Sequence, residues 1–381
     1  MKIERDFHMV KGDGETSYAK NSRMQRRAIL VTKPIVEKAI RGVCTDLQPQ
    51  SMVIADLGCA STPNTLLFVS EAITTVCENT SNTVAACPME VQFFLNDLPS
   101  NDFNYIFQSL EKSKQSTAQD CARRGLQPPP PHYVAGVPGS FYARLFPCNS
   151  VHLFHSSFSL MWLSQVPERL DGSMNEGNIH IAATTPPLVA RLYRDQFETD
   201  FSRFLQMRCS ELVPGGRMVL TILGRQRDEV VTAGGMTTAL ELLAQGMRTL
   251  VAEGRVDKEK LDSFNLPMYN PSADELKRLV KQSELLAISD IQLVETSWNP
   301  MDDDDSEPAE GGAGAEAAGR SISSSLRAVL ESLIVSHFGD SILDELFAAL
   351  ARNITRHIKS EVEKTTLTII SLSLQEGIHR Q

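Results

Sequence analysis

The stretch SMVIADLGCASTPNT (51–65) joins an apolar run to a carboxylate, a glycine and a turn, in that order. The run predicts a buried strand, and a helix is expected to begin near Thr65. Asp56 and Gly58 then stand at the carboxyl end of the strand, where open α/β sheets bind ligands and where a glycine lets a ligand approach the backbone closely. The stretch therefore predicts a ligand site on an α/β fold, with an ordinary strand-to-helix turn as the alternative.

Further short runs of aliphatic and aromatic residues predict five more strands. They are VQFFLND (91–97), HYVAGVPG (132–139), VHLFHS (151–156), RMVLTILG (217–224) and TLTIISLSL (366–374). Apolar residues at helical spacing occupy 189–212, 239–253, 272–282 and 326–333. Strands that alternate with helices predict an α/β fold with a mostly parallel sheet.

The sequence also predicts how the chain is divided. Residues 1–228 are expected to form the ligand-binding core, 229–320 a mainly helical cap over an enclosed pocket, and 321–381 the C-terminal helices and last strand that complete the core. The acidic, Gly/Ala-rich segment 302–321 is expected to be a surface loop, and its four aspartates a solvated charge run rather than a metal site. Segment 113–131, which ends in four prolines, is expected to be an exposed connection.

The composition disfavours several classes of protein. A net charge of -10 over 381 residues argues against a nucleic-acid or anionic-membrane partner. The seven cysteines show no CxxC pairing, so we expect reduced thiols rather than a zinc site or a disulfide framework. Because we find neither a signal-peptide pattern nor an apolar run of about 20 residues, we expect a soluble, cytoplasmic protein.

A second carboxylate, Asp97, ends the run FFLND (93–97). An acid at the end of the second strand is placed to accept hydrogen bonds from the 2′ and 3′ hydroxyls of a ribose, and a helix N-cap is the alternative. A nicotinamide dehydrogenase is excluded because Ala60 and Pro63 stand where GxGxxG requires glycines. We interpret His152 and His155 as structural, and the nearby serines lack the GxSxG pattern of a serine esterase.

Eight segments, in collinear order over nearly the whole chain, resemble the plant SABATH carboxyl methyltransferases. They are GDGETSYAKNSRMQ (12–25), ADLGCASTPNT (55–65), FFLNDLPSNDFNYIF (93–107), VPGSFYARLFP (137–147), FHSSFSLMWLSQVPE (154–168), ELVPGGRMVLTILGR (211–225), DSFNLPMYNPS (262–272) and LRAVLESLIVSHFG (326–339). The resemblance implies a Rossmann-like methyltransferase fold, with a mostly parallel seven-stranded sheet flanked by helices. It also implies methyl transfer from S-adenosylmethionine to a small carboxylic acid, by a protein that forms a homodimer.

The resemblance also implies roles for individual residues. The residues implied to contact S-adenosylmethionine are Tyr18, Cys59, Asn64, Asp97, Leu98, Ser140, Phe141 and Ser156. Gln25 and Trp162 are implied to hold the substrate carboxylate through an amide and an indole N–H. Both donors are neutral, so they orient the anion without neutralising it as an arginine would.

Two further sets follow from the same resemblance. The residues implied to line the acyl pocket are Phe158, Met161, Leu240, Tyr269, Leu326, Val329 and Leu367, for each of which core packing is the alternative. The residues implied to bind Mg²⁺ are Asn175, Asp262, Phe264 (through its carbonyl) and Asn265, an all-oxygen set that suits a hard cation.

This chemistry requires few catalytic residues. A carboxylic acid with a pKa near ~4 is already ionised at neutral pH, so no general base is needed. A sulfonium methyl group needs no acid to leave. What remains is alignment of the reacting atoms, which contributes on the order of 7–11 kcal/mol.

Several positions depart from the usual pattern of the family. Ala60 and Thr62 replace a serine and a glycine, and Thr62 is expected to crowd the cofactor or stiffen the turn. Phe158 replaces a frequent tyrosine, and Leu240 widens the pocket where salicylate-specific members often carry tryptophan. Met161 favours benzoate or salicylate as the substrate, followed by anthranilate and then jasmonate. A degenerate member that binds ligand without turnover is the non-enzymatic alternative.

Overall fold

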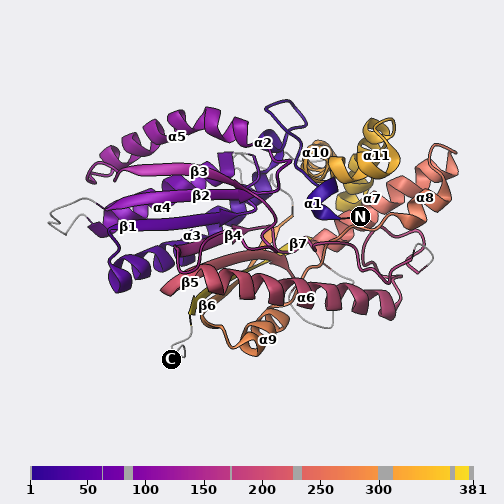
Figure 1. The fold of residues 1–381 in the computed structure, drawn as a ribbon. Helices are drawn as coiled ribbons and strands as arrows, with labels where there is room; N and C mark the ends of the chain where they lie inside the picture. The colour runs from indigo at the N-terminus through magenta and orange to yellow at the C-terminus, as the bar shows by residue number, and fades with distance from the viewer. Residues whose placement is uncertain are drawn as a thin grey trace.

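The computed structural model describes residues 2–61, 63–80, 89–171, 174–225, 234–298, 312–360 and 365–376. Within them, one sheet has the strand order β3-β2-β1-β4-β5-β7-β6. The strands are β1 (Ser51–Leu57), β2 (Glu90–Asp97), β3 (His132–Pro138), β4 (Val151–Ser157), β5 (Leu212–Gly224), β6 (Leu286–Ser297) and β7 (Thr366–Glu376). The predicted α/β fold with a seven-stranded sheet is confirmed (Figure 1).

The first five strands in this order are parallel, and β7 runs antiparallel to both β5 and β6. Asp56 pairs in register with Leu95 on one side and His155 on the other, so the ends of β1, β2 and β4 meet at one edge of the sheet. The predicted ligand site therefore lies at that edge.

Helices cover both faces of the sheet (Figure 1). The helices are α1 (Ile3–Asp6), α2 (Tyr18–Asn21), α3 (Arg23–Leu47), α4 (Pro63–Thr80), α5 (Phe103–Arg123), α6 (Pro187–Glu211), α7 (Gly235–Ala252), α8 (Lys258–Ser263), α9 (Ala273–Ser283), α10 (Gly312–Phe338) and α11 (Leu343–Ser360). Helices α3, α4 and α5 pack side by side, and α6 packs with α9. Successive residues of β1 pack on opposite faces of the sheet. Ile54 belongs to the apolar cluster with α3–α5, and Ala55 belongs to the cluster with α6.

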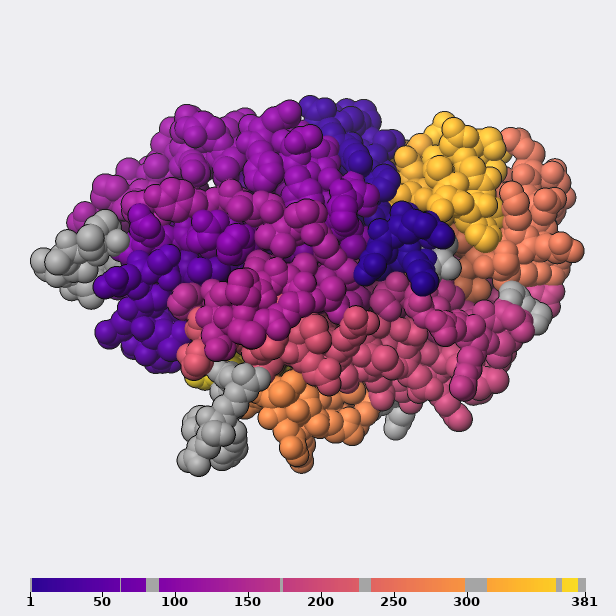
Figure 2. Space-filling view, viewed as in Figure 1, coloured from indigo at the N-terminus to yellow at the C-terminus, as the bar shows by residue number. Residues whose placement is uncertain are grey.

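A separate group of helices, α7, α8, α10 and α11, stands beyond one end of the sheet (Figure 1). The N-terminal segment lies against α10: the amide of Val10 donates to the Ala328 carbonyl at 2.9 Å, and the amide of His8 donates to Ser332 Oγ at 3.0 Å. Figure 2 shows this segment, in indigo, bordering the yellow C-terminal helices.

The structure corrects three of the predicted boundaries. Leu286–Ser297, assigned to the helical cap, is the edge strand β6. Gly312–Ser321, predicted as part of a surface loop, begins α10, whereas 302–311 and the aspartate run lie outside the described residues. Residues 113–123, predicted as a connection, continue α5 to Arg123, and only the segment after it is a connection.

Candidate active site

The turn after β1 brings backbone groups close to neighbouring side chains. Gly58 adopts φ +73°, and a Cβ built on it would lie 2.2 Å from Ser159 Oγ, so this position requires glycine. The amides of Gly58 and Cys59 both donate to the Asn96 carbonyl at 2.9 Å. Ala60 follows with φ +54°, and Thr62 lies outside the described residues. The turn thereby joins the ends of β1 and β2.

Asp97 accepts one backbone hydrogen bond on each carboxylate oxygen. Oδ2 accepts from the Ala60 amide and Oδ1 from the Leu98 amide, both at 2.7 Å. Each oxygen keeps a further lone pair for a ligand hydroxyl. Burial raises the pKa of Asp97 to about 6. The N-cap alternative is wrong, because α5 is capped by Asp102, which accepts from the Tyr105 amide at 3.1 Å.

Three other predicted cofactor residues gather at the same place. The buried Tyr18 hydroxyl hydrogen-bonds to Asn64, whose Nδ2 also donates to Ser22 Oγ at 3.0 Å. Burial and the nearby Asp97 raise the pKa values of the Tyr18 hydroxyl and the Cys59 thiol, so both groups are neutral at pH 7. Tyr18, Cys59, Asn64 and Asp97 thus form one polar cluster beside the turn.

The loop after β3 carries Ser140 and Phe141. A ring carbon of Phe141 would lie 3.6 Å from a Cβ on Gly58, so the loop approaches the β1 turn. Arg208 donates to the carbonyls of Phe141 (2.6 Å) and Ala143 (2.8 Å). Glu211 accepts from the amides of Leu145 (2.7 Å) and Phe146 (3.0 Å). Neither of these buried residues is among those predicted from the sequence.

The two serines at the end of β4 differ. Ser156 Oγ donates to the Leu57 carbonyl at 2.9 Å and is therefore occupied within the protein. Ser157 Oγ is buried and has no hydrogen-bond partner among the described residues, and the same holds for Ser61 Oγ in the β1 turn. Buried hydroxyls without partners are costly unless a ligand or water satisfies them. Ser156 is among the residues predicted from the sequence, whereas Ser61 and Ser157 are not.

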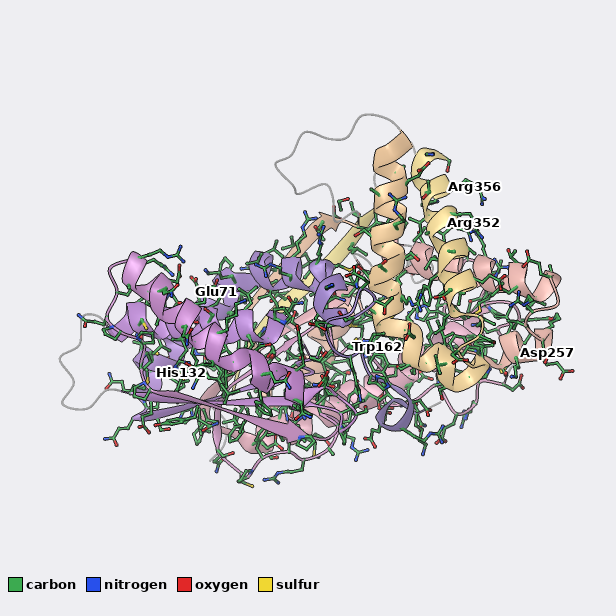
Figure 3. The ribbon with its side chains drawn as sticks, turned by 90° about the horizontal axis from the view of Figure 1, so that it is seen from above. Glu71, His132, Trp162, Asp257, Arg352 and Arg356 are labelled. Atoms are coloured by element: carbon green, nitrogen blue, oxygen red, sulfur yellow. The ribbon has the colours of Figure 1, made fainter. Side chains whose placement is uncertain are left out.

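Gln25 and Trp162, the predicted carboxylate anchors, lie on α3 and in the segment after β4. Gln25 Oε1 is buried and has no partner among the described residues. The Trp162 ring is 5% exposed, and its centroid lies 4.4 Å from that of Phe7. Tyr142 donates to the Trp162 carbonyl at 2.7 Å, and Trp162 forms a β-bridge with Met268. Figure 3 places Trp162 between the sheet and helices α10 and α11.

The seven predicted acyl-pocket residues all belong to, or pack against, one hydrophobic cluster that also contains Trp162. Tyr269 differs from the other six residues because its side chain carries a hydroxyl group. Its hydroxyl donates to Glu275 Oε1 at 2.7 Å and accepts from Arg225 at 3.1 Å, so it is committed to a buried ion-pair network. Within the Tyr269 side chain, the ring rather than the hydroxyl is therefore the part that can contact an apolar ligand.

Asn175, one of the predicted magnesium ligands, is bound to protein groups through its side-chain amide. Asn175 Nδ2 donates to Asn265 Oδ1 (2.8 Å) and to the His180 carbonyl (3.2 Å). Asn175 Oδ1 accepts from Thr185 (2.9 Å) and Asn178 (3.3 Å). The side-chain amide of Asn175 is thus fully satisfied by protein groups, which does not fit the octahedral oxygen shell that Mg²⁺ demands.

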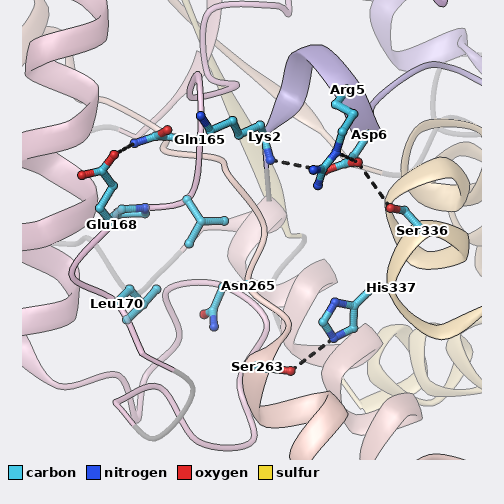
Figure 4. A pocket seen from close by; sticks show the side chains of 12 residues that line it. Lys2, Arg5, Asp6, Gln165, Glu168, Leu170, Ser263, Asn265, Ser336 and His337 are labelled. Atoms are coloured by element: carbon cyan, nitrogen blue, oxygen red, sulfur yellow. Dashed lines mark hydrogen bonds and ion pairs between the residues drawn. The ribbon is translucent and has the colours of Figure 1, made fainter.

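A cleft of about 440 Å³ opens beside this network (Figure 4). Its lining residues are Lys2, Arg5, Asp6, Gln165, Val166, Pro167, Glu168, Leu170, Ser263, Asn265, Ser336 and His337. None of them is a predicted cofactor or acyl contact, so the cleft is separate from the predicted acid pocket.

Other groups with possible chemistry are committed to the fold. His155 Nδ1 lies 2.7 Å from Asp56 Oδ1, and its ring stacks on Phe68, in keeping with a structural histidine. The described cysteines are all free thiols. The described residues hold no group of three or more His, Cys, Asp or Glu side chains placed to share a metal ion. Among the same residues, no helix is both long and apolar enough to cross a membrane.

Comparisons with known proteins identify the family of the chain. Residues 4–375 match the model of the SAM-dependent carboxyl methyltransferase family, where SAM is S-adenosylmethionine. The chain is 46% identical to anthranilate O-methyltransferase 1 of Zea mays, and 46% identical to a Zea mays protein named inactive anthranilate O-methyltransferase 1, over 99% of each chain in both cases. It is similar to the structure of loganic acid methyltransferase with SAH, at TM-score 0.82 and 30% identity, over 98% of this chain and 100% of that one. The chain therefore belongs to the SAM-dependent carboxyl methyltransferase family.

Proposed function

We propose that the protein transfers a methyl group from SAM to the carboxylate of a small aromatic acid of the benzoate or salicylate type, giving a methyl ester. The observation that carries the choice of acid is the position of Trp162, which lies in one apolar cluster together with the residues proposed to line the acyl pocket. Neutral polar anchors within an apolar pocket suit an aryl carboxylate. The apolar side chains remove water from the ring, and the polar anchors orient the carboxylate.

The polar cluster at the β1 turn is proposed to hold the cofactor. Asp97 has a free lone pair on each oxygen for the ribose hydroxyls. Tyr18, Asn64, Ser140 and Phe141 are proposed to contact the rest of the molecule, together with Cys59, Leu98 and either Ser156 or Ser157. When bound there, SAM supplies an activated methyl group.

The chain's own part in the reaction is binding and exclusion of water. Gln25 and Trp162 fix the carboxylate, and the cluster containing Phe158, Met161 and Leu240 removes water from around it. Desolvation raises the reactivity of a carboxylate towards a cationic centre. No side chain has to move a proton, since the acid is ionised at neutral pH. Magnesium is not part of this proposal, because the amide of Asn175 is satisfied by protein groups.

Ring substituents are proposed to decide between related acids. Among the seven residues proposed to line the acyl pocket, only Tyr269 carries a hydroxyl group, and this hydroxyl is bound to Glu275. An ortho hydroxyl or amino group forms its hydrogen bond within the acid itself, so salicylate and anthranilate fit the same pocket as benzoate. The 46% identity to an anthranilate enzyme supports including that acid, and jasmonate is the less favoured alternative.

A second candidate is ligand binding without turnover. It is favoured by the 46% identity to a protein named as inactive, and by Thr62 in place of the glycine expected in the cofactor turn.

One experiment separates the two candidates. The protein is incubated with methyl-labelled SAM and a panel of benzoate, salicylate, anthranilate and jasmonate, while calorimetry measures SAM binding. We expect labelled ester from an aromatic acid, identified by product mass. Binding of SAM with no ester from any acid would establish the second candidate. The homodimer and the cytoplasmic location remain predictions, and light scattering of the purified protein tests the first.

A further inference from the structure

Asp262, one of the predicted magnesium ligands, and the carboxylate of Glu176 share a cation of the protein's own. Lys258 Nζ lies 2.6 Å from Asp262 Oδ2 and also contacts the Glu176 carboxylate. Asp262 Oδ1 accepts from the Gly177 amide at 3.1 Å.

This ammonium joins two segments that approach Trp162. Residues 175–180 and 262–268 are linked by the Leu266 amide, which donates to the Ile179 carbonyl at 2.8 Å. The His180 ring adds a second link, with Nε2 2.8 Å from the Met268 carbonyl. Met268 forms the β-bridge with Trp162, one of the proposed carboxylate anchors.

We propose that the Lys258 ammonium is the resident cation between Asp262 and Glu176, and that the protein braces these two segments without binding Mg²⁺. Two observations carry this. Lys258 already forms ion pairs with both carboxylates that would attract a divalent ion, and the donor oxygens of Asn175 and Asn265 are bound to protein hydrogen-bond donors.

Physical chemistry favours the lysine over the ion. Lys258 and Asp262 are four residues apart on α8, a spacing that puts oppositely charged side chains on one helix face. The ammonium is covalently attached, so placing it costs no translational freedom. Mg²⁺ would instead have to shed water, which it does reluctantly, and to displace existing hydrogen bonds.

The test measures metal uptake directly and does not depend on methyl transfer. Mn²⁺ is titrated into the wild type and the variants Lys258→Ala and Lys260→Ala, and free Mn²⁺ is followed by electron paramagnetic resonance. Lys260→Ala is the matched control, because it removes the same charge from an exposed position of the same helix.

We expect no stoichiometric Mn²⁺ uptake by the wild type or by Lys260→Ala. Lys258→Ala should bind one Mn²⁺ per chain, at least tenfold more tightly than the wild type does. MgCl₂ should raise the melting temperature of Lys258→Ala only, and adding Asp262→Asn to that variant should abolish both effects. One Mn²⁺ in the wild type that Asp262→Asn removes would overturn the proposal. So would a folded Lys258→Ala variant that takes up none.

Discussion

Arg208 and Glu211 lie three residues apart on α6, joined at 2.7 Å (Nε to Oε2), and neither side chain has any exposed surface. Their remaining hydrogen-bonding groups hold the loop of Ser140 and Phe141 on the cofactor side of the sheet. Burial of a charge pair is costly unless each atom is satisfied, and here the backbone of that loop provides the partners.

Breaking this pair should loosen the loop. We expect Arg208→Met to destabilise the fold by about 3–5 kcal/mol, because the buried Glu211 charge keeps only the more distant Arg144, with Nε 3.9 Å away, as an ionic partner. The double variant Arg208→Met/Glu211→Leu should recover only part of that stability, because the pair's charges are gone but the loop's backbone groups lose their partners. It should still bind SAM more weakly, because neither side chain holds the loop. Chemical denaturation and calorimetry measure the two effects, with exposed Arg191→Ala as the control. Wild-type SAM affinity in the double variant would contradict a positioning role.

The acid and cofactor sites should respond to different substitutions. Removing a hydrogen bond to a charged group costs roughly 1.5–3 kcal/mol. Gln25→Ala and Trp162→Phe should therefore raise KM for the acid about 10- to 100-fold with little change for SAM, and Asp97→Asn should do the reverse. Steady-state kinetics with each substrate varied in turn measures this. Equal losses for both substrates in all three variants would refute the assignment.

SAM affinity should depend on pH through Asp97. Its folded-state pKa of about 6 lies above that of a free aspartate, so its proton is retained to higher pH. Above about pH 6 the ionised carboxylate accepts the ribose hydroxyls and attracts the cationic cofactor, and both interactions weaken as pH falls through 6. Calorimetry between pH 5 and 8 should show this loss, and Asp97→Asn should flatten the profile. For stability the sign is opposite: the raised pKa makes ionisation of Asp97 unfavourable to the fold, so its contribution falls as pH rises towards 6.

Gly58→Ala should destabilise the protein by more than the strain of a left-handed backbone conformation alone. Gly254 has nearly the same φ (+70° against +73°), but a Cβ there would meet nothing within 4 Å. Gly254→Ala thus reports the left-handed strain alone, about 1–2 kcal/mol. Gly58→Ala should lose more stability and weaken SAM binding, and Ser159→Gly should partly rescue it by removing the clash. Equal losses of stability in the two single variants would show that the close approach to Ser159 is unimportant.

The main sheet was predictable because its strands are apolar runs, and the errors have physical causes. The edge strand β6 is half exposed and carries Asp290 and Glu295, so it lacks the apolar pattern of a buried strand. The start of α10 was predicted as loop because of its glycines. A Cβ on Gly319 would lie 2.3 Å from Thr355 Oγ1, so small residues there allow α10 to pack closely on α11.

Site residues could be predicted where a sequence motif marks the end of a strand. They were harder to predict where the direction of a side chain decides whether it faces the site. Asp97 follows from its place at the end of β2. Ser156 and Ser157 are adjacent on β4 and point to opposite sides, so spacing could not tell which hydroxyl is free. Arg208 and Glu211 gave no signal, because their backbone partners lie more than sixty residues away.

The last strand of the chain, β7, lies between β5 and β6 in the sheet. A ribosome makes β6 and then two long helices before it makes the only strand that pairs with β6 among those described. Until β7 has been synthesised, the nascent chain exposes the open edges of both β5 and β6, which are ready templates for pairing with another chain. Expression of this protein should therefore be highly sensitive to a truncation that removes β7, because β5 and β6 then lose the strand that joins them.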